Sequence, residues 1–321
     1  MGVSFKTLSA LFFIYVIVFL SIRIKYGGLT LIEKIAYAGL PNCYRAYNEE
    51  IELIASSDTG PRVLHFGFAG KWNEFVPAQK HGFSGHRLWH APEAFPRSYI
   101  ADDRPVEFTE HKQFFSLTQS VEKETSIQKE MDISINPDNN HLTVVHRLYN
   151  RGLWPVEIAP WAISAMATGG KAIFPLPARK PADRTNLLPT SLLAIWEYSD
   201  LSDPRLKIGK RFFILAQDVK AAAPLKIGVM DTDNWVAYWN KGHLFLKTFE
   251  YKKNGVYPDF GSSAESYSSD RILELETVAP LKLVQPNEAV DHVENWYLFR
   301  DVPEPFNDAD IEKNILTLIP A

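Results

Sequence analysis

The segment Gly85–Glu93 concentrates side chains that can bind polar ligands or exchange protons. It reads GHRLWHAPE. In an extended strand, His86 and His90 would share one face, and Arg87 and Trp89 would share the other. An arginine beside an aromatic ring suits a sugar, because the guanidinium group donates to hydroxyls while the ring packs on C–H faces. A buried arginine held by a carboxylate, with Trp89 in the core, is the structural alternative.

Metal binding by the two histidines is not predicted. Pro92 would break a helix in this segment, and the sequence holds no HExxH pattern. Walker A, GxGxxG and GxSxG patterns and cysteine clusters are also absent from the sequence. We therefore expect neither a metal nor another cofactor.

Two further segments contain a single charged residue among apolar ones. Glu157 is the one acid in the run Trp154–Met166, so it must either pair with a cation or act as an acid with a raised pKa. Trp161 in the same run could form a sugar platform with Trp154, although core packing is the commoner fate of tryptophan. Lys247 lies among phenylalanines, where it either lines a pocket or extends to solvent.

The segment Tyr257–Glu276 supplies four candidate bases, namely Asp259, Glu265, Glu274 and Glu276. Strand geometry places Glu274 and Glu276 on one face and the intervening leucines on the other. Such an acidic face suits proton abstraction from a hydroxyl if it borders a cleft. A solvated acidic face is the alternative.

These candidates fall on short strands that must position them. Alternating or apolar segments recur along the chain, separated by Gly, Pro, Asn or Asp, and no strand is followed by a long amphipathic helix. We therefore predict an all-β fold, a large antiparallel sandwich in one domain. The predicted strands are 50–55, 62–68, 112–119, 126–135, 142–149, 155–166, 211–217, 235–239, 244–251, 272–278 and 292–299.

The N-terminus has a different character. Residues 7–22 carry no charge, and as a helix they would span about 24 Å, which flanking Lys and Arg side chains can extend. Small residues of a cleavage site do not follow directly, so an uncleaved membrane anchor is favoured over a signal peptide. Because the tail before the apolar run is short, we expect a single-pass protein with its domain on the periplasmic or extracellular side.

The predicted organisation is an anchor or signal at 1–28, a linker helix at 29–41 and a β-sandwich domain at 42–321. Residues 1–28 hold three of the 34 Lys and Arg and none of the 38 Asp and Glu, so the rest carries 31 against 38, a net charge of −7. This acidic balance argues against nucleic acid as a partner. The single cysteine, Cys43, excludes an internal disulfide.

Five segments together resemble a widespread bacterial family of unknown function related to the aldose 1-epimerases, or galactose mutarotases. The resemblance covers residues from about 42 to 300, in the family's order. It implies a galactose-mutarotase-like β-supersandwich with a concave sugar cleft. The segments are TGPRVLHFGF (59–68), GHRLWHAPE (85–93), NRGLWPVEIAPWAISAMATGGKAIFPLP (150–177), YPDFG (257–261) and LELETVAPLKLVQPNEAVDHVENW (273–296).

The resemblance also implies roles for individual residues. Arg87 would donate to sugar hydroxyls, and Glu276, or Glu274 one pleat earlier, would be the general base. The epimerases carry a catalytic histidine about a dozen residues after an Asn that resembles Asn150, where this chain has Trp161. Another acid would then have to serve.

Candidates for that acid are His86, His90 and Glu157, and His86 is the better one if it faces the cleft. The functions that follow are a membrane-anchored carbohydrate-binding protein, an aldose 1-epimerase-like isomerase, or a non-catalytic scaffold with a vestigial cleft. The expected partners are a carbohydrate and the membrane.

Overall fold

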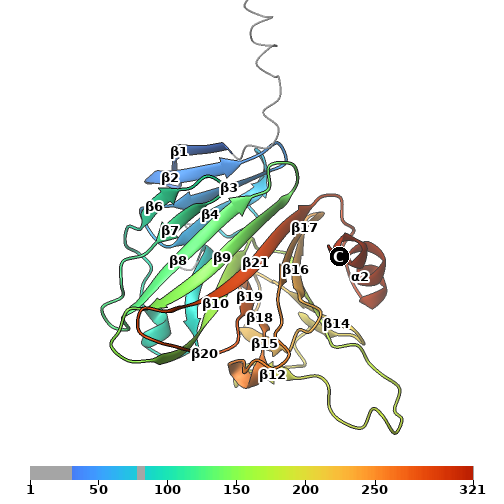
Figure 1. Ribbon diagram of the computed structural model, residues 1–321. Helices are drawn as coiled ribbons and strands as arrows, with labels where there is room; N and C mark the ends of the chain where they lie inside the picture. The colour runs from blue at the N-terminus through green and yellow to red at the C-terminus, as the bar shows by residue number, and fades with distance from the viewer. Residues whose placement is uncertain (1–30, 78–83, 321) are drawn as a thin grey trace, which may run out of the picture.

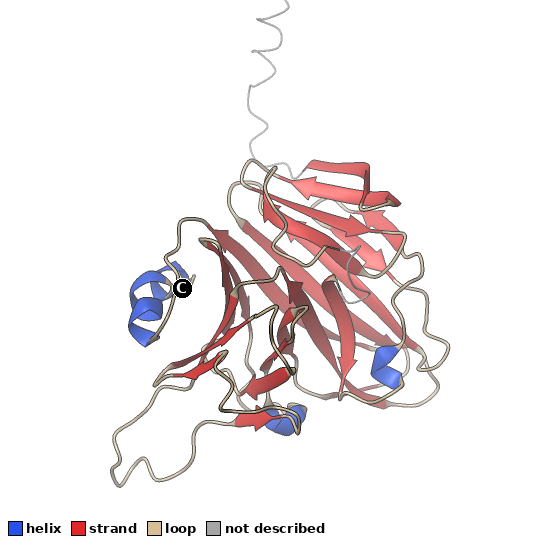
Figure 2. Cartoon of the chain, turned by 180° about the vertical axis from the view of Figure 1, so that it is seen from behind, coloured by secondary structure: helices blue, strands red, loops and turns tan. Residues whose placement is uncertain are grey.

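Two large antiparallel sheets pack face to face in the computed structural model, which describes residues 31–77 and 84–320. Figures 1 and 2 show the two layers from opposite sides, with the short helices at the periphery. The all-β prediction is therefore confirmed. The described part of the chain contains one α-helix, α2 (Asp308–Asn314), next to the C-terminus.

The first sheet has eleven strands, and it carries the segments singled out above. Its order is β1 (Leu31–Tyr37), β2 (Leu40–Tyr47), β3 (Ile51–Ser56), β4 (Arg62–Phe68), β5 (Gly85–Ala91), β10 (Val156–Met166), β19 (Leu273–Val278), β18 (Ala264–Ser268), β15 (Leu225–Val229) and β12 (Leu193–Ile195), with β20 (Lys282–Val284) paired to β10.

The second sheet has ten strands. Its order is β13 (Leu206–Ile208), β14 (Phe212–Ala216), β11 (Lys171–Pro175), β16 (Trp235–Asn240), β17 (His243–Phe249), β21 (Ala289–Phe299), β9 (His141–Asn150), β8 (Ile127–Ile135), β7 (Phe115–Thr118) and β6 (Glu107–Glu110).

Buried and partly exposed residues alternate strictly along two strands of the second sheet. In β8 and β9 every second residue is buried, as expected for strands with one face on a core and one in solvent. The main hydrophobic cluster takes residues from both sheets, such as Leu53 and Leu275 from one and Val144 and Trp296 from the other. The two sheets therefore share this hydrophobic core.

The predicted linker helix at 29–41 is wrong over its described part. Residues 31–37 form β1 and residues 40–47 form β2, which pair in antiparallel register from Leu31↔Tyr47 to Tyr37↔Leu40. The sandwich therefore includes these residues and does not begin at 42. The apolar residues that suggested a helix face are equally compatible with an edge strand, and pairing with β2 decides between the two.

The predicted membrane anchor, at 1–28, lies outside the described residues. Among the residues that are described, no helix has both the length and the apolar character needed to span a membrane.

Candidate functional site

A cleft of about 360 Å³ lies on the outer face of the eleven-stranded sheet. Strand β5 fixes this orientation: His86 hydrogen-bonds to His146 of the other sheet, so it points inward, and its neighbour Arg87 points outward. The cleft mixes aromatic, cationic and acidic side chains. Its lining consists of Arg87, Trp89, Glu93, Tyr99, Trp161, Ile163, Tyr198, Lys226, Tyr267, Ser269, Arg271, Ile272 and Glu274.

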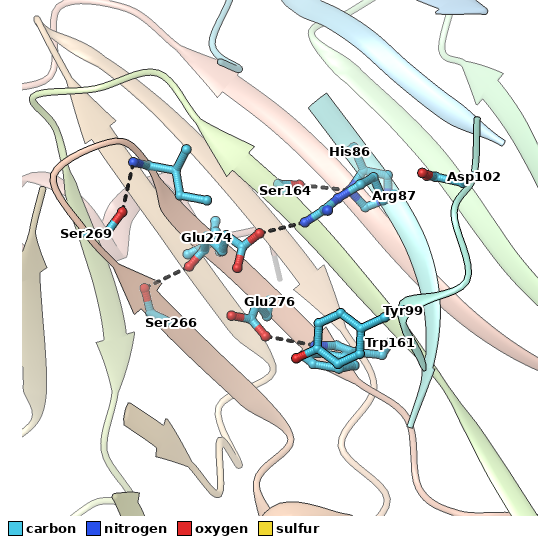
Figure 3. A network of polar contacts seen from close by, with 12 residues as sticks. His86, Arg87, Tyr99, Asp102, Trp161, Ser164, Ser266, Ser269, Glu274 and Glu276 are labelled. Atoms are coloured by element: carbon cyan, nitrogen blue, oxygen red, sulfur yellow. Dashed lines mark hydrogen bonds and ion pairs between the residues drawn. The ribbon is translucent and has the colours of Figure 1, made fainter. Parts of the chain in front are cut away.

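Arg87 is fixed at one side of the cleft. Its Nη2 donates to Oε1 of Glu274 at 2.5 Å, as Figure 3 shows, and its guanidinium carbon lies 5.1 Å from the centroid of the Trp89 ring. Burial lowers the pKa of Arg87, although the nearby carboxylate of Glu274 opposes that shift. Arg87 and Trp89 thus line the cleft together, and Glu274 takes the role of the arginine's carboxylate partner.

An aromatic wall stands beside this pair. The rings of Trp89 and Tyr99 meet edge to face with centroids 5.0 Å apart, and those of Trp89 and Trp161 do so at 5.6 Å. Tyr99 and Tyr198 are each more than two-fifths exposed, at 43% and 47%. Exposed aromatic rings next to hydrogen-bond donors are suited to the C–H faces and hydroxyls of a sugar.

A lysine with two carboxylates forms the other side of the cleft. The Nζ of Lys226 lies 2.9 Å from Oε2 of Glu265 and 3.1 Å from Oε2 of Glu276. Strands β18 and β19 pair so that Glu265 stands directly opposite Glu276. Both acids are fully buried, and neither lines the cleft.

The cluster of Lys226, Glu265 and Glu276 contains two carboxyl groups and one ammonium group. Burial raises the pKa of Glu276 to about 7, although Lys226 opposes the shift. Burial also raises the pKa of Glu265. For Lys226, burial disfavours the charged form, but the two carboxylates outweigh it and raise the pKa of the ammonium group. One ammonium thus faces two buried carboxyl groups that hold protons more tightly than usual.

Trp161 occupies the position where the resemblance leads one to expect a histidine. Its Nε1 donates to Oε2 of Glu276 at 2.8 Å, and the pair is drawn in Figure 3. The expected base is therefore held by Trp161 on one side and by Lys226 on the other. Glu276 lies directly beneath the cleft that Arg87 and Trp89 line.

Three predicted site residues lie in the interior between the sheets. His86 is fully buried and does not face the cleft, so the condition for its role as acid is not met. His90 is buried beside Glu122, which pairs with Lys129 at 2.7 Å. Lys247 is also fully buried and pairs with a carboxylate, so neither alternative considered for it holds.

Lys247 belongs to a closed polar network with Glu294 at its centre. Oε1 of Glu294 accepts from Lys247 at 2.9 Å and from the hydroxyl of Thr277 at 2.6 Å, and Oε2 accepts from Trp296 at 2.7 Å. Nε2 of His292 in turn lies 2.7 Å from the Thr277 hydroxyl. Burial alone would raise the pKa of Glu294, but Lys247, two neighbouring histidines and the hydrogen bond from Thr277 together outweigh burial and hold the value near 2.

The same region groups possible metal ligands. The Nε2 atoms of His86 and His146 and a carboxylate oxygen of Glu294 lie within 4.8 Å of one another. His146 Nδ1 faces the carbonyl of His292 at 3.1 Å and must carry a proton there, so its Nε2 accepts from His86 at 2.6 Å. With both Glu294 oxygens taken and the ammonium of Lys247 adjacent, these residues fit a hydrogen-bond network better than a metal.

The remaining predicted residues lie away from the cleft lining. Glu157 is exposed on β10 and is absent from the cleft lining, so the buried setting expected for it is missing. Trp154 is 78% exposed and shares no platform with Trp161, which lines the cleft. Asp259 lies in the 3-10 turn η2 (Asp259–Gly261) and is absent from the lining.

Some cleft residues were not predicted from the sequence. Lys226 stands in the apolar run LKIGV of β15. It is the one charged residue there, and it points to the face opposite to Leu225 and Ile227, which is the only feature of the sequence that could have marked it as a site residue. Tyr99 and Tyr198 lie outside named strands, in segments without periodicity.

Comparison with known proteins identifies the architecture. A galactose mutarotase-like protein from Lactobacillus casei aligns with a TM-score of 0.56 at 10% identity, covering 80% of this chain and all of that one. A candidate aldose 1-epimerase from Klebsiella pneumoniae aligns with a TM-score of 0.55 at 11% identity, covering 91% of each chain. The chain has the galactose-mutarotase-like fold.

Other structures with this fold give the same picture. A galactose mutarotase-like protein from Clostridium acetobutylicum aligns with a TM-score of 0.51 at 10% identity and covers 84% of this chain. No protein-family model and no curated protein matches the sequence. Because identity is this low, the likeness establishes the galactose-mutarotase-like fold, and function must be argued from the cleft itself.

Proposed function

We propose that this protein binds a carbohydrate in the cleft on the outer face of the eleven-stranded sheet. The observation that carries the proposal is the arrangement of Trp89, Tyr99 and Trp161 as a wall between two fixed cations, Arg87 and Lys226. Aromatic faces bury the apolar side of a pyranose ring, and the cations donate to its hydroxyl oxygens. A volume of about 360 Å³ is within the range of small-ligand sites.

A second candidate function is interconversion of sugar anomers, as in an aldose 1-epimerase. The pKa of Glu276, raised by burial to about 7, favours it, because a group that titrates near neutral pH can both accept and return a proton. Against it stands the engagement of Glu276 by Trp161 and Lys226. Binding is therefore the function that the geometry supports best.

A glycan array tests binding, and anomer-exchange NMR on each bound sugar tests chemistry. The full-length chain should be used in a detergent without a sugar headgroup, because a maltoside could occupy the cleft. Binding without exchange is the expected result. If exchange occurs, Glu276→Gln should lower its rate by about 10²–10⁴-fold. An array without any bound glycan would contradict the proposal.

The sequence also supports a proposal on placement in the cell. The uncharged run at residues 7–22 is slightly shorter than the hydrocarbon core of a bilayer, and its flanking cations can extend it as in a membrane anchor. We expect the full chain to remain in the membrane fraction after an alkaline wash, with the domain accessible to added protease on the outer side. Release of the full chain by the wash would count against the anchor.

A further inference from the structure

We infer that Lys226 is the residue that meets the ligand's oxygen atoms, and that Glu265 and Glu276 position it from beneath without touching the ligand. This inference rests on the proposed carbohydrate binding. It departs from the role that the resemblance implies for Glu276, which is that of a base in direct contact with a sugar hydroxyl.

The positions of Lys226 and the two glutamates relative to the cleft support this assignment. Lys226 lines the cleft, whereas both glutamates have no exposed surface and are missing from the lining. Because Lys226 lies within 2.9 Å of one carboxylate and 3.1 Å of the other, its ammonium group separates them from the cleft. A ligand in the cleft therefore reaches the lysine first.

The ammonium group is also held from its other sides. Its Nζ lies 4.6 Å from the ring centroids of both Trp161 and Trp196, a distance suited to cation–π contact. The backbone is fixed as well: the amide of Lys226 donates to the hydroxyl of Ser199 at 2.9 Å, and that hydroxyl donates to the carbonyl of Lys226 at 2.6 Å. A donor fixed in this way loses little freedom when a ligand binds.

Hydrogen-bond capacity leaves room for a ligand. An ammonium group has three N–H donors. Within the described part of the chain, the ammonium group donates a hydrogen bond to Glu276 and forms an ion pair with Glu265. A further N–H can be donated to a hydroxyl or ring oxygen in the cleft.

Charge favours an uncharged ligand. The positive charge of Lys226 is already balanced by two buried carboxyl groups, and Glu274 balances Arg87 in the same way. Glu93 adds a further acid to the lining, and Arg271 of the lining lies 3.9 Å from the carboxylate of the aspartate that precedes it. The phosphate of a sugar phosphate or the carboxylate of a uronate would add negative charge beside these carboxyl groups. Neutral sugars should therefore bind more tightly than their 6-phosphates or uronic acids.

A double-mutant cycle distinguishes positioning from direct contact. The probe is the tightest binder among D-glucose, D-galactose, D-mannose and N-acetyl-D-glucosamine, measured by titration calorimetry on the full chain. Lys226→Met should weaken binding about 10- to 100-fold, the loss of one charge-assisted hydrogen bond. Glu276→Gln should weaken it about 3- to 10-fold. The double variant should bind like Lys226→Met alone.

Additive losses in the double variant would overturn the inference, because Glu276 would then act on the ligand without Lys226. Lys226→Arg keeps the charge and should recover part of the affinity. Lys253→Met, at an exposed lysine, is the matched control and should leave binding unchanged. Unchanged binding in a folded Lys226→Met, together with a loss in Tyr99→Ala, would refute the inference and leave carbohydrate binding intact.

A second arm needs no sugar, so it remains decisive if none of the four probes binds. Lys226→Ala should open a cage of two carboxyl groups and two tryptophan rings that takes up ethylammonium. Increasing ethylammonium should then raise the melting temperature of Lys226→Ala in a saturable way, with a smaller rise in Lys226→Ala/Glu276→Gln. Lys253→Ala should show no such rise. Equal responses in all three variants would contradict the positioning role.

Discussion

Two lysine–carboxylate centres lie on opposite faces of strand β19, and they differ in how completely their polar groups are matched. On the inner face, Glu294 accepts from Lys247, Thr277 and Trp296, so both of its oxygens are engaged. On the outer face, one ammonium group, that of Lys226, serves two buried glutamates.

The difference shows which centre is structural and which is poised for a ligand. A matched buried network fixes the packing of two sheets, whereas excess acid beneath a cleft leaves hydrogen-bonding capacity unused. The pKa values agree with this division. The pKa of Glu294 is held near 2 because Lys247 and the other polar partners of Glu294 together outweigh burial, and the pKa of Glu276 is raised to about 7 because burial outweighs Lys226.

The largest difference between the two centres should appear in the free energy of unfolding when each lysine is replaced in turn. Lys247→Met leaves the Glu294 charge fully buried without its cation and should cost about 3–5 kcal/mol in the free energy of unfolding. Lys226→Met should cost less, about 1–2 kcal/mol, because Glu265 and Glu276 already hold protons readily and lie next to a cleft. Urea unfolding at pH 7 measures both. A greater loss for Lys226→Met would reverse the assignment of the two centres.

The pH dependence of stability gives the next largest effect. Between its ordinary pKa of 4.5 and about 7, Glu276 binds more protons in the folded state than in the unfolded state. The free energy of unfolding should therefore fall as pH rises through this window, by up to about 3 kcal/mol.

Glu276→Gln should remove that decline, so wild type and variant should differ in the slope of unfolding free energy against pH. The exposed Glu250→Gln is the control and should keep the wild-type slope. A Glu276→Gln variant that retains the full decline would show that Glu276 does not titrate in this window.

The smallest effect is expected at Glu157, which is exposed on β10. Glu157→Gln should change the unfolding free energy by less than about 0.5 kcal/mol and leave sugar binding unaltered. Chemical denaturation and calorimetry measure the two quantities. A clear loss of binding would return Glu157 to the list of ligand-contacting residues.

The sequence predicted the strands better than it predicted which of their faces carries function. Periodicity correctly put Arg87 and Trp89 on one face of β5 and His86 on the other. It could not show that the histidine face would meet the second sheet, because that depends on packing between distant segments. For the same reason, Glu157 was placed in a buried setting that the structure does not provide.

Residues missed by sequence reasoning lacked a local signal. Lys226 sits in a strand that otherwise reads as core, and its partners come from β18, β19 and the segment around Trp196. His146 and Glu294 occupy positions where the alternation of β9 and β21 calls for apolar residues. A polar residue at a position where the alternation places buried residues was the one indication in the sequence that a buried polar network would form there.

The central claim is that the aromatic wall of the outer-face cleft binds a carbohydrate. The most direct test is titration calorimetry of the best array glycan into wild type, Tyr99→Ala, Tyr198→Ala and Trp154→Ala. The first two remove exposed rings that line the cleft, and the third removes an exposed ring away from it, so all three variants should fold. We predict that Tyr99→Ala and Tyr198→Ala each weaken binding about 5- to 10-fold, the value of a sugar-stacking aromatic contact of about 1–1.5 kcal/mol, and that Trp154→Ala binds like wild type. Unchanged affinity in both tyrosine variants, or a loss confined to Trp154→Ala, would contradict the account.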